Sequence, residues 1–575
     1  MSTPGMGAIP TDNGYAFRVW APNASAVSVV GEFNDWKEDA HPLTLEGNGH
    51  WYGEIPEVTT GQEYRFFITR EGNSFYRIDP RAQAVTNSIG NGLTYDHSAF
   101  DWQGDNFTTP GLHELVIYET HIGSFMDDGD GGPADLTDLT SKIGYLKDLG
   151  INAVELMPLM EFAGDYSWGY NPAHIFAVES SYGGPDALKT FIREAHKNGI
   201  AVIIDVVYNH FGPSDLSLWQ FDGWSENDKG GIYFYQDWRS ATPWGDTRPD
   251  YGRQEVRDFI LDNARMWLRD YHADGLRLDM TPYMRAVDGF SGDIPDGWRM
   301  MHDVGALVRS EFPGRITIAE DLHNTPAVTS ADEGGMDAQW DCEFVHPVRA
   351  ALTTPDDAHR SISTVAGAIT HRYHHPFDRV IYTESHDEVA NGSARIPTEV
   401  DANNADGWAA QKRATLGAAL VLTAPGVPML FQGQEFLEDE WFRDTIPLDW
   451  EHAWQFRDIT QMFRDLISLR RNLYGDAPGL SGPETAVVCA DEGAKVLAFT
   501  RGTLDGAQTL VAANFSTNPA SVSIDFSGQW KVIFNSDAAR YSALFGNHPT
   551  PDIDATSGRA LLEIGPYSVV IYAQQ

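Results

Sequence analysis

Four short stretches of the chain carry acidic side chains at the ends of strand-like runs, and three of them also contain histidine or arginine. They are DVVYNH (205–210), DGLRLDMT (274–281), IAED (318–321) and ESHDE (384–388). One strand-end acid is commonly a helix cap, but four such stretches indicate a site, because ionised carboxylates in a partly dry cleft need cations or hydrogen bonds. Paired carboxylates without a Cys/His ligand set are typical of glycoside chemistry, in which one carboxylate attacks the anomeric carbon and a protonated one protonates the leaving oxygen.

The second stretch sets a cation two residues from an anion. Alternation along a strand puts Arg277 and Asp279 on one face, while Leu276 and Leu278 point to the other. We expect the cation to keep Asp279 ionised, as a nucleophile requires. Glu320 follows an apolar run and lies near other acids, which favours a raised pKa and the role of proton donor.

Eight strand-like runs carry these stretches and alternate with helix-like segments such as 184–199, 253–272 and 458–473. The predicted strands are 114–121, 151–158, 200–210, 274–281, 315–322, 337–344, 380–386 and 427–436. The alternation predicts an α/β fold with a parallel sheet, and the count predicts a (β/α)₈ TIM barrel, whose reactive groups lie at the C-terminal strand ends. The aromatic- and Gly-rich insertion 211–250 is expected to face the substrate.

Short runs of alternating polar and apolar residues flank the barrel segment on both sides. They predict an N-terminal β-sandwich over 1–108 and a C-terminal all-β sandwich over 478–575, leaving 109–477 for the barrel. The chain has 575 residues, 42% of them hydrophobic and 12% aromatic. A chain of that length is expected to divide into two or three domains.

The charge balance excludes some classes of partner. A formal net charge of −42, from 82 acidic and 40 basic residues, argues against nucleic acid and against an anionic membrane surface. Cys342 and Cys489 belong to no CxxC pair or metal-ligand cluster, so we expect free thiols. The sequence shows neither a leader pattern nor an apolar run approaching 18 residues, and we expect a cytoplasmic protein.

The four stretches, in this order and on predicted strands, resemble the conserved regions of the α-amylase superfamily of retaining α-glucoside enzymes. The resemblance spans essentially the whole chain, because this family also carries a C-terminal β domain. It implies that Asp279 is the nucleophile, Glu320 the general acid/base and Asp387 a third carboxylate that grips sugar hydroxyls. The substrate-binding residues that it implies are Arg277, His210, His386, Asp205 and, in SWGYNP, Tyr170.

The resemblance also bears on metals. Some amylases bind calcium through an asparagine near the first region, where this chain has Asn209. No other part of the sequence supports a cage of six or more oxygen ligands. We therefore expect neither a metal nor a cofactor.

Three features resemble the glycogen and starch branching enzymes of this family, which cut an α-1,4 chain and rejoin it through a 6-hydroxyl. The segment 17–36 is similar to their N-terminal carbohydrate-binding β-sandwich. The segment TESHDEV (383–389) is similar to their SHDEV or SHDQ motif. The segments MLFQGQEF (429–436) and PLDW (447–450) are similar to their MGxEF and LDW segments. The first domain contains three tryptophans, for each of which two roles are open: stacking on glucan or packing in the core of the sandwich. They are Trp20, Trp36 and Trp51.

The chain departs from the bacterial branching pattern after both catalytic candidates. After the first candidate, Met280 and Thr281 stand where Ala or Gly and Val are usual. After the second, Asp321 and Leu322 stand where Ser-Thr is usual, and this pair is more like eukaryotic branching enzymes or trehalohydrolases. The expected function is a 1,4-α-glucan branching enzyme, monomeric, acting on glycogen, starch or maltooligosaccharides. The alternatives are a maltooligosyltrehalose trehalohydrolase, an α-amylase-type hydrolase or transglycosylase, and a non-catalytic glucan-binding scaffold, against which the intact carboxylate set argues.

Overall fold

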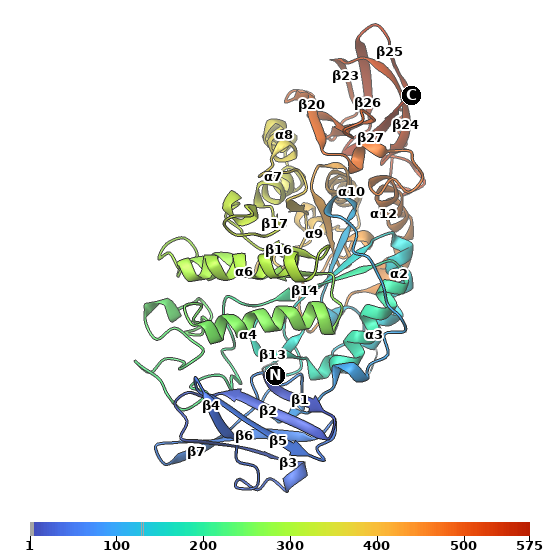
Figure 1. The fold of residues 1–575 in the computed structure, drawn as a ribbon. Coiled ribbons are helices and arrows are strands. Elements are labelled where there is room, and N and C mark those ends of the chain that lie inside the picture. The colour runs from blue at the N-terminus through green and yellow to red at the C-terminus, as the bar shows by residue number, and fades with distance from the viewer. Residues whose placement is uncertain (1–4, 128, 130) are drawn as a thin grey trace.

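The computed structural model describes residues 5–127, 129 and 131–575. A central barrel has an all-β domain at each end, the N-terminal one in blue and the C-terminal one in red (Figure 1). The predicted fold class, a TIM barrel between two β domains, is therefore confirmed. Among the described residues, no helix combines the length and the apolar character that crossing a bilayer requires.

Two antiparallel sheets form the N-terminal domain. The first contains β1 (Gly7–Thr11), β2 (Gly14–Trp20), β5 (His50–Pro56) and β4 (Thr44–Gly47) in that order, and the second β3 (Ala26–Gly31), β6 (Glu63–Arg70), β9 (Gly92–Leu93) and β8 (Ala84–Val85), with β7 (Asn73–Arg77) beside β6. Trp20 and Trp51 are both buried. Trp20 packs edge-to-face on Tyr233 and the Trp51 indole donates to the Ala21 carbonyl, so both belong to the core.

The barrel is closed by eight strands, and every neighbouring pair is parallel. In order they are β10 (Ile117–Thr120), β11 (Ala153–Leu156), β14 (Ala201–Val206), β15 (Gly275–Leu278), β16 (Ile316–Ala319), β17 (Ala338–Trp340), β18 (Arg379–Ile381) and β19 (Val427–Phe431). Seven of them lie inside a predicted strand, and β18 begins one residue before the predicted 380–386. The prediction for 337–344 was too long, because the Asp341 carboxylate accepts from the Glu343 amide and caps a helix that begins at Cys342.

Helices surround the barrel (Figure 1), and others lie in the loops that follow its strands. They are α1 (Leu136–Ser141), α2 (Ile143–Leu149), α3 (Gly184–Lys197), α4 (Gln254–Arg265), α5 (Thr281–Arg285), α6 (Pro295–Glu311), α7 (Cys342–Thr353), α8 (Ile362–Thr370), α9 (Ile396–Val400), α10 (Trp408–Thr423), α11 (Trp450–Gln455) and α12 (Arg457–Arg470). The helix predicted over 253–272 ends earlier as an α-helix, since Met266–Asp270 forms a π-helical turn. A hairpin of β12 (Met160–Phe162) and β13 (Pro172–Val178) follows β11 and carries Tyr170 in its turn.

The insertion 211–250 contacts the N-terminal domain. The Asp222 carboxylate accepts from both the backbone and the side-chain amide of Asn23, at 2.9 Å each. Arg77 donates to the Phe221 carbonyl at 3.0 Å. The insertion thus joins the first domain to the barrel, and it also contributes Trp244, whose ring stacks on His210.

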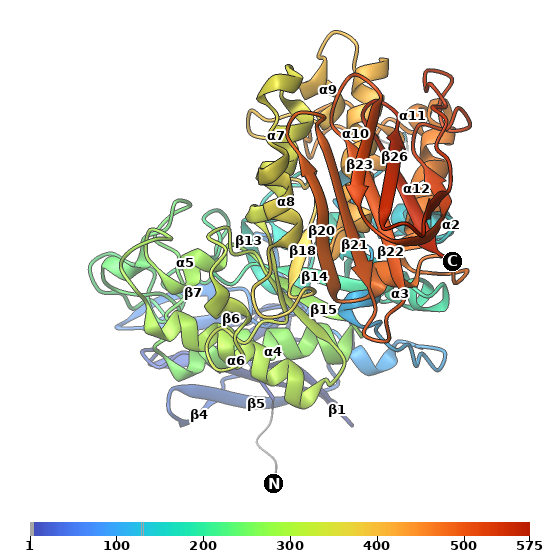
Figure 2. The ribbon, with the colours of Figure 1, turned by 90° about the horizontal axis from the view of Figure 1, so that it is seen from above.

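The C-terminal domain pairs a six-stranded sheet with a two-stranded one. The larger runs β20 (Glu484–Asp491), β21 (Val496–Gly502), β22 (Gln508–Asn514), β27 (Ser568–Gln574), β24 (Gly528–Asn535) and β25 (Ile553–Ala555), and the smaller pairs β23 (Ala520–Asp525) with β26 (Arg559–Ile564). Helix α8 lies beside β20 (Figure 2), and the Glu492 carboxylate accepts from the Ser363 amide there. A buried ion pair of 2.7 Å between Lys412 and Asp537 ties this domain to α10.

Candidate active site

The predicted site residues meet at the carboxyl ends of the barrel strands. Asp205 and Arg277 are register partners on β14 and β15, and Asp279 follows directly at the end of β15. Glu320 ends β16 in the same way. Because neighbouring parallel strands end together, side chains that are far apart in sequence lie within hydrogen-bonding distance of one another.

Arg277 links three carboxylates. Its guanidinium lies 2.7 Å from Asp205, 2.9 Å from Glu320 and 3.2 Å from Asp279, and its own side chain is fully buried. The Trp340 ring covers the guanidinium at 4.3 Å from its centroid, which adds a cation–π contact. Arg277 is therefore shared among the acids, and Asp279 is the most distant of the three partners.

This sharing corrects the expectation that Arg277 alone holds Asp279 ionised. Burial and the neighbouring charge of Glu320 raise the pKa of the Asp279 carboxyl well above its usual range, and Arg277 opposes them only in part. Burial likewise raises the pKa of Asp205 to about 6. Buried acids that share one cation take up a proton more readily than a free carboxyl does.

The Glu320 carboxylate is held by one of its two oxygens. Oε2 accepts from the Met280 backbone amide at 2.8 Å and pairs with Arg277. Oε1 is buried, and it has no hydrogen-bond partner within the described part of the chain. Met280 adopts a left-handed backbone with φ 37°, uncommon for a residue with a side chain. That turn directs its amide at Glu320 and leaves Oε1 available for proton transfer.

Asn209 fixes two neighbours at once. Its amide nitrogen donates to Oδ2 of Asp279 at 2.6 Å and to the Asp279 carbonyl at 2.9 Å. Its amide oxygen lies 2.6 Å from Nδ1 of His210, so that nitrogen carries the proton and Nε2 is left as an acceptor. Burial lowers the pKa of His210 to about 3, which keeps the ring neutral. Sequence reasoning noted Asn209 as a calcium candidate, whereas the structure gives it a positioning role.

His386 is paired with an acid that the sequence analysis did not identify. Its Nδ1 lies 2.5 Å from Oε1 of Glu119, on β10. Although burial favours the neutral ring, the charges of Asp387 and Glu119 raise the pKa of His386 to about 10, and the ring is cationic at neutral pH. A signal was present, since Glu119 interrupts an otherwise apolar strand.

Tyr170 closes one side of the site. Its ring stacks on His386 with centroids 5.1 Å apart, and its hydroxyl donates to Asp205 at 2.7 Å. Asp387 lies at the rim, with 45% of its side chain exposed and Oδ2 3.5 Å from Nε2 of His386. The predicted residues therefore lie together, with Asp387 exposed at the rim, Tyr170 partly exposed and the others buried.

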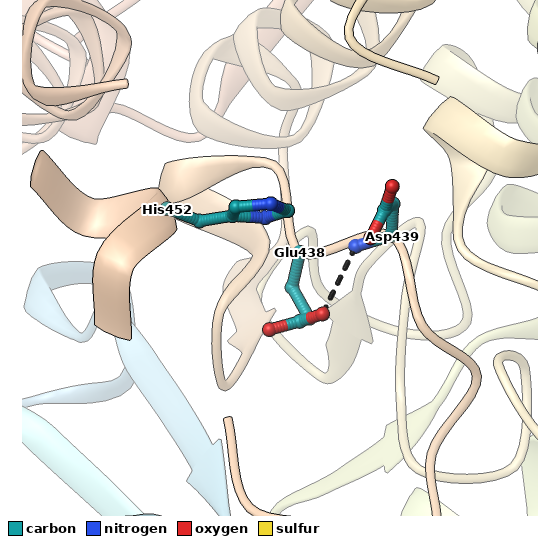
Figure 3. Close-up of side chains that lie close together, drawn as sticks. All are labelled: Glu438, Asp439 and His452. Carbon is teal, nitrogen blue, oxygen red and sulfur yellow. Dashed lines mark hydrogen bonds between the residues drawn. The ribbon is translucent and has the colours of Figure 1, made fainter. Parts of the chain in front are cut away.

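A separate group of possible metal ligands follows β19. Ligand atoms of Glu438, Asp439 and His452 lie within 4.8 Å of one another (Figure 3). The Glu438 carboxylate accepts from three backbone amides, those of Asp439, Glu440 and Asp449, at 3.0 to 3.2 Å. These bonds give Glu438 a structural role, which is to hold the loop after the last strand.

A closed (β/α)₈ barrel with interlinked buried carboxylates at its strand ends places the protein among the TIM-barrel enzymes. Three family descriptions match its sequence: carbohydrate-binding module 48 (isoamylase N-terminal domain) over residues 5–82, the α-amylase catalytic domain over 120–240 and 213–469, and the α-amylase C-terminal all-beta domain over 487–575. The chain belongs to the α-amylase family.

Curated relatives in bacteria are similar over most of the chain. The 1,4-alpha-glucan branching enzyme GlgB of Corynebacterium diphtheriae is 31% identical, over 92% of this chain and 75% of the relative. That of Marinobacter nauticus is 30% identical, over 94% and 90%. That of Nitrosomonas europaea is 32% identical, over 92% and 75%.

Solved structures share the fold. A putative alpha amylase from Salmonella typhimurium superposes with a TM-score of 0.78 at 21% identity, covering 100% of both chains. A pullulanase from an Anoxybacillus species, complexed with maltotetraose, gives 0.77 at 24% identity, covering 100% of this chain and 88% of that one. At these identities the likeness concerns the fold.

Proposed function

We propose that the protein is a 1,4-α-glucan branching enzyme that works through a covalent glycosyl-enzyme. The observation that carries the proposal is the Arg277-linked set of Asp205, Asp279 and Glu320, in a chain similar to curated branching enzymes over more than nine tenths of its length. A neutral polysaccharide also suits a chain of net charge −42. The substrates we propose are glycogen, starch and maltooligosaccharides.

In the first half-reaction, an Asp279 carboxylate oxygen attacks C1 of the bound glucosyl unit. The bond from C1 to the O4 of the departing chain breaks, and O4 takes a proton from Oε1 of Glu320, the oxygen that no described residue engages. Asp279 must be the anion at this point and Glu320 the acid. Arg277 contacts both carboxyls and stabilises whichever of them is ionised, while the Asn209 amide, which donates to Oδ2 of Asp279, favours the Asp279 anion.

In the second half-reaction, Glu320 acts as the base. It takes the proton from the 6-hydroxyl of an acceptor glucose, whose oxygen attacks C1 and releases Asp279 as the carboxylate. The net change is one α-1,4 bond lost and one α-1,6 bond formed, with no new reducing end. Hydrolysis follows the same path with water as the acceptor.

The remaining polar residues bind the sugar. Neutral His210 offers Nε2 as an acceptor for a sugar hydroxyl, whereas cationic His386 is a donor. Tyr170 offers a ring face beside them, and Asp387 at the rim is positioned to accept from hydroxyl groups that enter the cleft. This arrangement supports the binding roles that the family resemblance implies.

The test is incubation with amylose, with reducing ends and α-1,6 linkages counted together. The proposal predicts new α-1,6 bonds with little gain of reducing ends, and the Asp279→Asn variant should produce neither. Rising reducing sugar without new linkages would identify a hydrolase. Asp321, after the acid/base candidate, is also typical of trehalohydrolases, so trehalose released from a trehalosyl-capped oligosaccharide would favour that activity.

We also propose that the enzyme works in the cytoplasm. Cys342 and Cys489 are both free, as is usual for proteins in reducing compartments. Fractionation of the source cells, with the protein followed by antibody, tests the proposal.

A further inference from the structure

Thr281 and Asp321, two of the residues at which this chain departs from the branching-enzyme pattern, belong to one hydrogen-bonded unit. The Thr281 hydroxyl donates to the Glu320 carbonyl at 2.9 Å and lies 3.2 Å from Oδ2 of Asp321. Arg285 grips Asp321 through two bonds of 2.9 and 3.0 Å, and the Asp321 side chain is fully buried. The unit begins at the proposed acid/base and extends outward along the loop after β16.

Its outer end supports an exposed aromatic ring. The His323 amide donates to Asp321 at 3.4 Å, and Nδ1 of His323 lies 3.4 Å from the Arg285 guanidinium. The Phe290 ring stacks on His323 with centroids 4.0 Å apart and planes 22° apart. Phe290 is nevertheless 81% exposed, so His323 covers one ring face and the other faces solvent.

The loop that carries Phe290 is braced. Ala286 and Asp293 form an isolated antiparallel bridge at its base. The Asp288 carboxylate accepts from the amides of Phe290 and Ser291, at 2.8 and 2.5 Å. The backbone that carries the ring is therefore held in place, and His323 restricts the ring on one face, which lowers the entropy lost when a ligand stacks on it.

A second exposed ring adjoins the same loop. Trp238, in the short 3₁₀ turn Trp238–Ser240 of the insertion, is 61% exposed. It packs so closely on Gly292 that a Cβ there would lie 3.2 Å from the indole. On the inner side, Trp244 stacks on His210 at 4.4 Å and meets Tyr283 edge-on at 5.2 Å. Aromatic rings thus lie between the sugar-binding histidine and the exposed loop.

We infer that Phe290 and Trp238 form a binding platform for an α-glucan chain on the Glu320 side of the cleft, outside the subsite of the reacting glucose. The inference rests on the proposed function for its ligand. Aromatic rings bind the apolar faces of sugar rings without requiring charge. Exposing two large apolar rings to water is unfavourable unless they bind a ligand. Both rings here are packed against neighbouring residues, Phe290 against His323 and Trp238 against Gly292.

The direct test measures binding without turnover. Glu320→Gln protein is titrated calorimetrically with maltoheptaose, alone and combined with Phe290→Ala, Trp238→Ala or both. Tyr474→Ala is the matched control, because Tyr474 is 82% exposed and follows α12, away from the strand ends. We expect Phe290→Ala to weaken Kd about tenfold, the double variant to weaken it further, and Tyr474→Ala to leave it unchanged. Phe290→Tyr keeps the ring and should bind normally.

A second readout separates a local role from general damage. With otherwise wild-type protein, Phe290→Ala should raise KM for amylose while leaving kcat/KM for an aryl α-maltoside unchanged, since a small aryl leaving group does not reach the platform. Equal Kd values for Phe290→Ala and its parent would overturn the inference. A loss of affinity in Tyr474→Ala as large as that in Phe290→Ala would overturn it as well. If the wild type leaves amylose unaltered but maltoheptaose binding still depends on Phe290, the proposed function fails and the binding platform stands. If amylose is branched but maltoheptaose binding does not depend on Phe290, the platform fails and the proposed function stands.

Discussion

The guanidinium of Arg277 lies closer to Glu320, at 2.9 Å, than to Asp279, at 3.2 Å, although Asp279 is only two residues away along the same strand. The cation therefore bridges the proposed nucleophile and the proposed acid/base. It stabilises whichever of them is ionised, so one buried charge serves both half-reactions.

Replacing Arg277 by lysine tests this bridging. A lysine keeps the charge, but its donors all lie on one ammonium nitrogen, whereas two guanidinium nitrogens of Arg277 divide the three carboxylates between them. We expect kcat/KM on amylose to fall about 10²- to 10³-fold. Arg299→Lys is the control, because Arg299 is 59% exposed and pairs with Asp303 at 3.6 Å. An Arg277→Lys enzyme with near-normal activity would show that positive charge alone suffices.

Asn209 controls the ionisation of Asp279 in our account. In Asn209→Asp a second carboxylate lies beside Asp279, disfavours its anion and raises its pKa further. Because activity needs the Asp279 anion, the acidic limb of the kcat/KM profile should move to higher pH. Measuring that profile on a maltooligosaccharide checks the sign, and a shift to lower pH would contradict the positioning role.

The Glu119–His386 pair predicts an effect at alkaline pH. The folded-state pKa of His386, about 10, lies above its ordinary value of 6.5, so the pair stabilises the fold below about pH 6.5 and loses that contribution as the pH rises towards 10. Glu119→Gln removes a charge that raises this pKa, so His386 should lose its proton at lower pH. Histidine NMR and the alkaline limb of kcat/KM measure the change, and an unmoved titration would refute it.

The sequence was sufficient to predict the eight strands and the four reactive stretches, because alternation and strand–helix order are local patterns. Contacts between strands were not accessible in this way. Nothing local indicates that Arg277 lies nearer Asp205 than Asp279, or that Trp340 from β17 covers it. Barrel closure brings these side chains together, which is also why the partnership of Glu119 with His386 was missed.

The departures after the catalytic candidates illustrate the same limit. Thr281 and Asp321 were recognised as unusual residues, but their interaction became apparent only when β15 and β16 were placed side by side. The exposed Phe290 had no sequence signal, since an isolated aromatic in a polar loop is equally typical of a buried anchor. Solvent exposure of a single ring depends on the whole surrounding surface.

Asp321 should contribute strongly to stability. Asp321→Ala leaves Arg285, whose side chain is 12% exposed, without its two-bond partner, and breaking a buried pair costs about 3 to 5 kcal/mol. The thermal midpoint of the barrel should fall by at least about 4 °C. Asp303→Ala, which removes an exposed pair, should change it little. Equal midpoints for the two variants would contradict the buried unit.

The most direct test of the retaining mechanism is to trap the glycosyl-enzyme. Fluoride leaves without a proton, so Glu320→Gln protein supplied with α-maltosyl fluoride should complete the first half-reaction and stall, since the base needed for the second is absent. Intact mass spectrometry should then show one added maltosyl group, and peptide mapping should place it on Asp279. Rapid cleavage of the fluoride with no adduct, or an adduct on another carboxylate, would contradict the account.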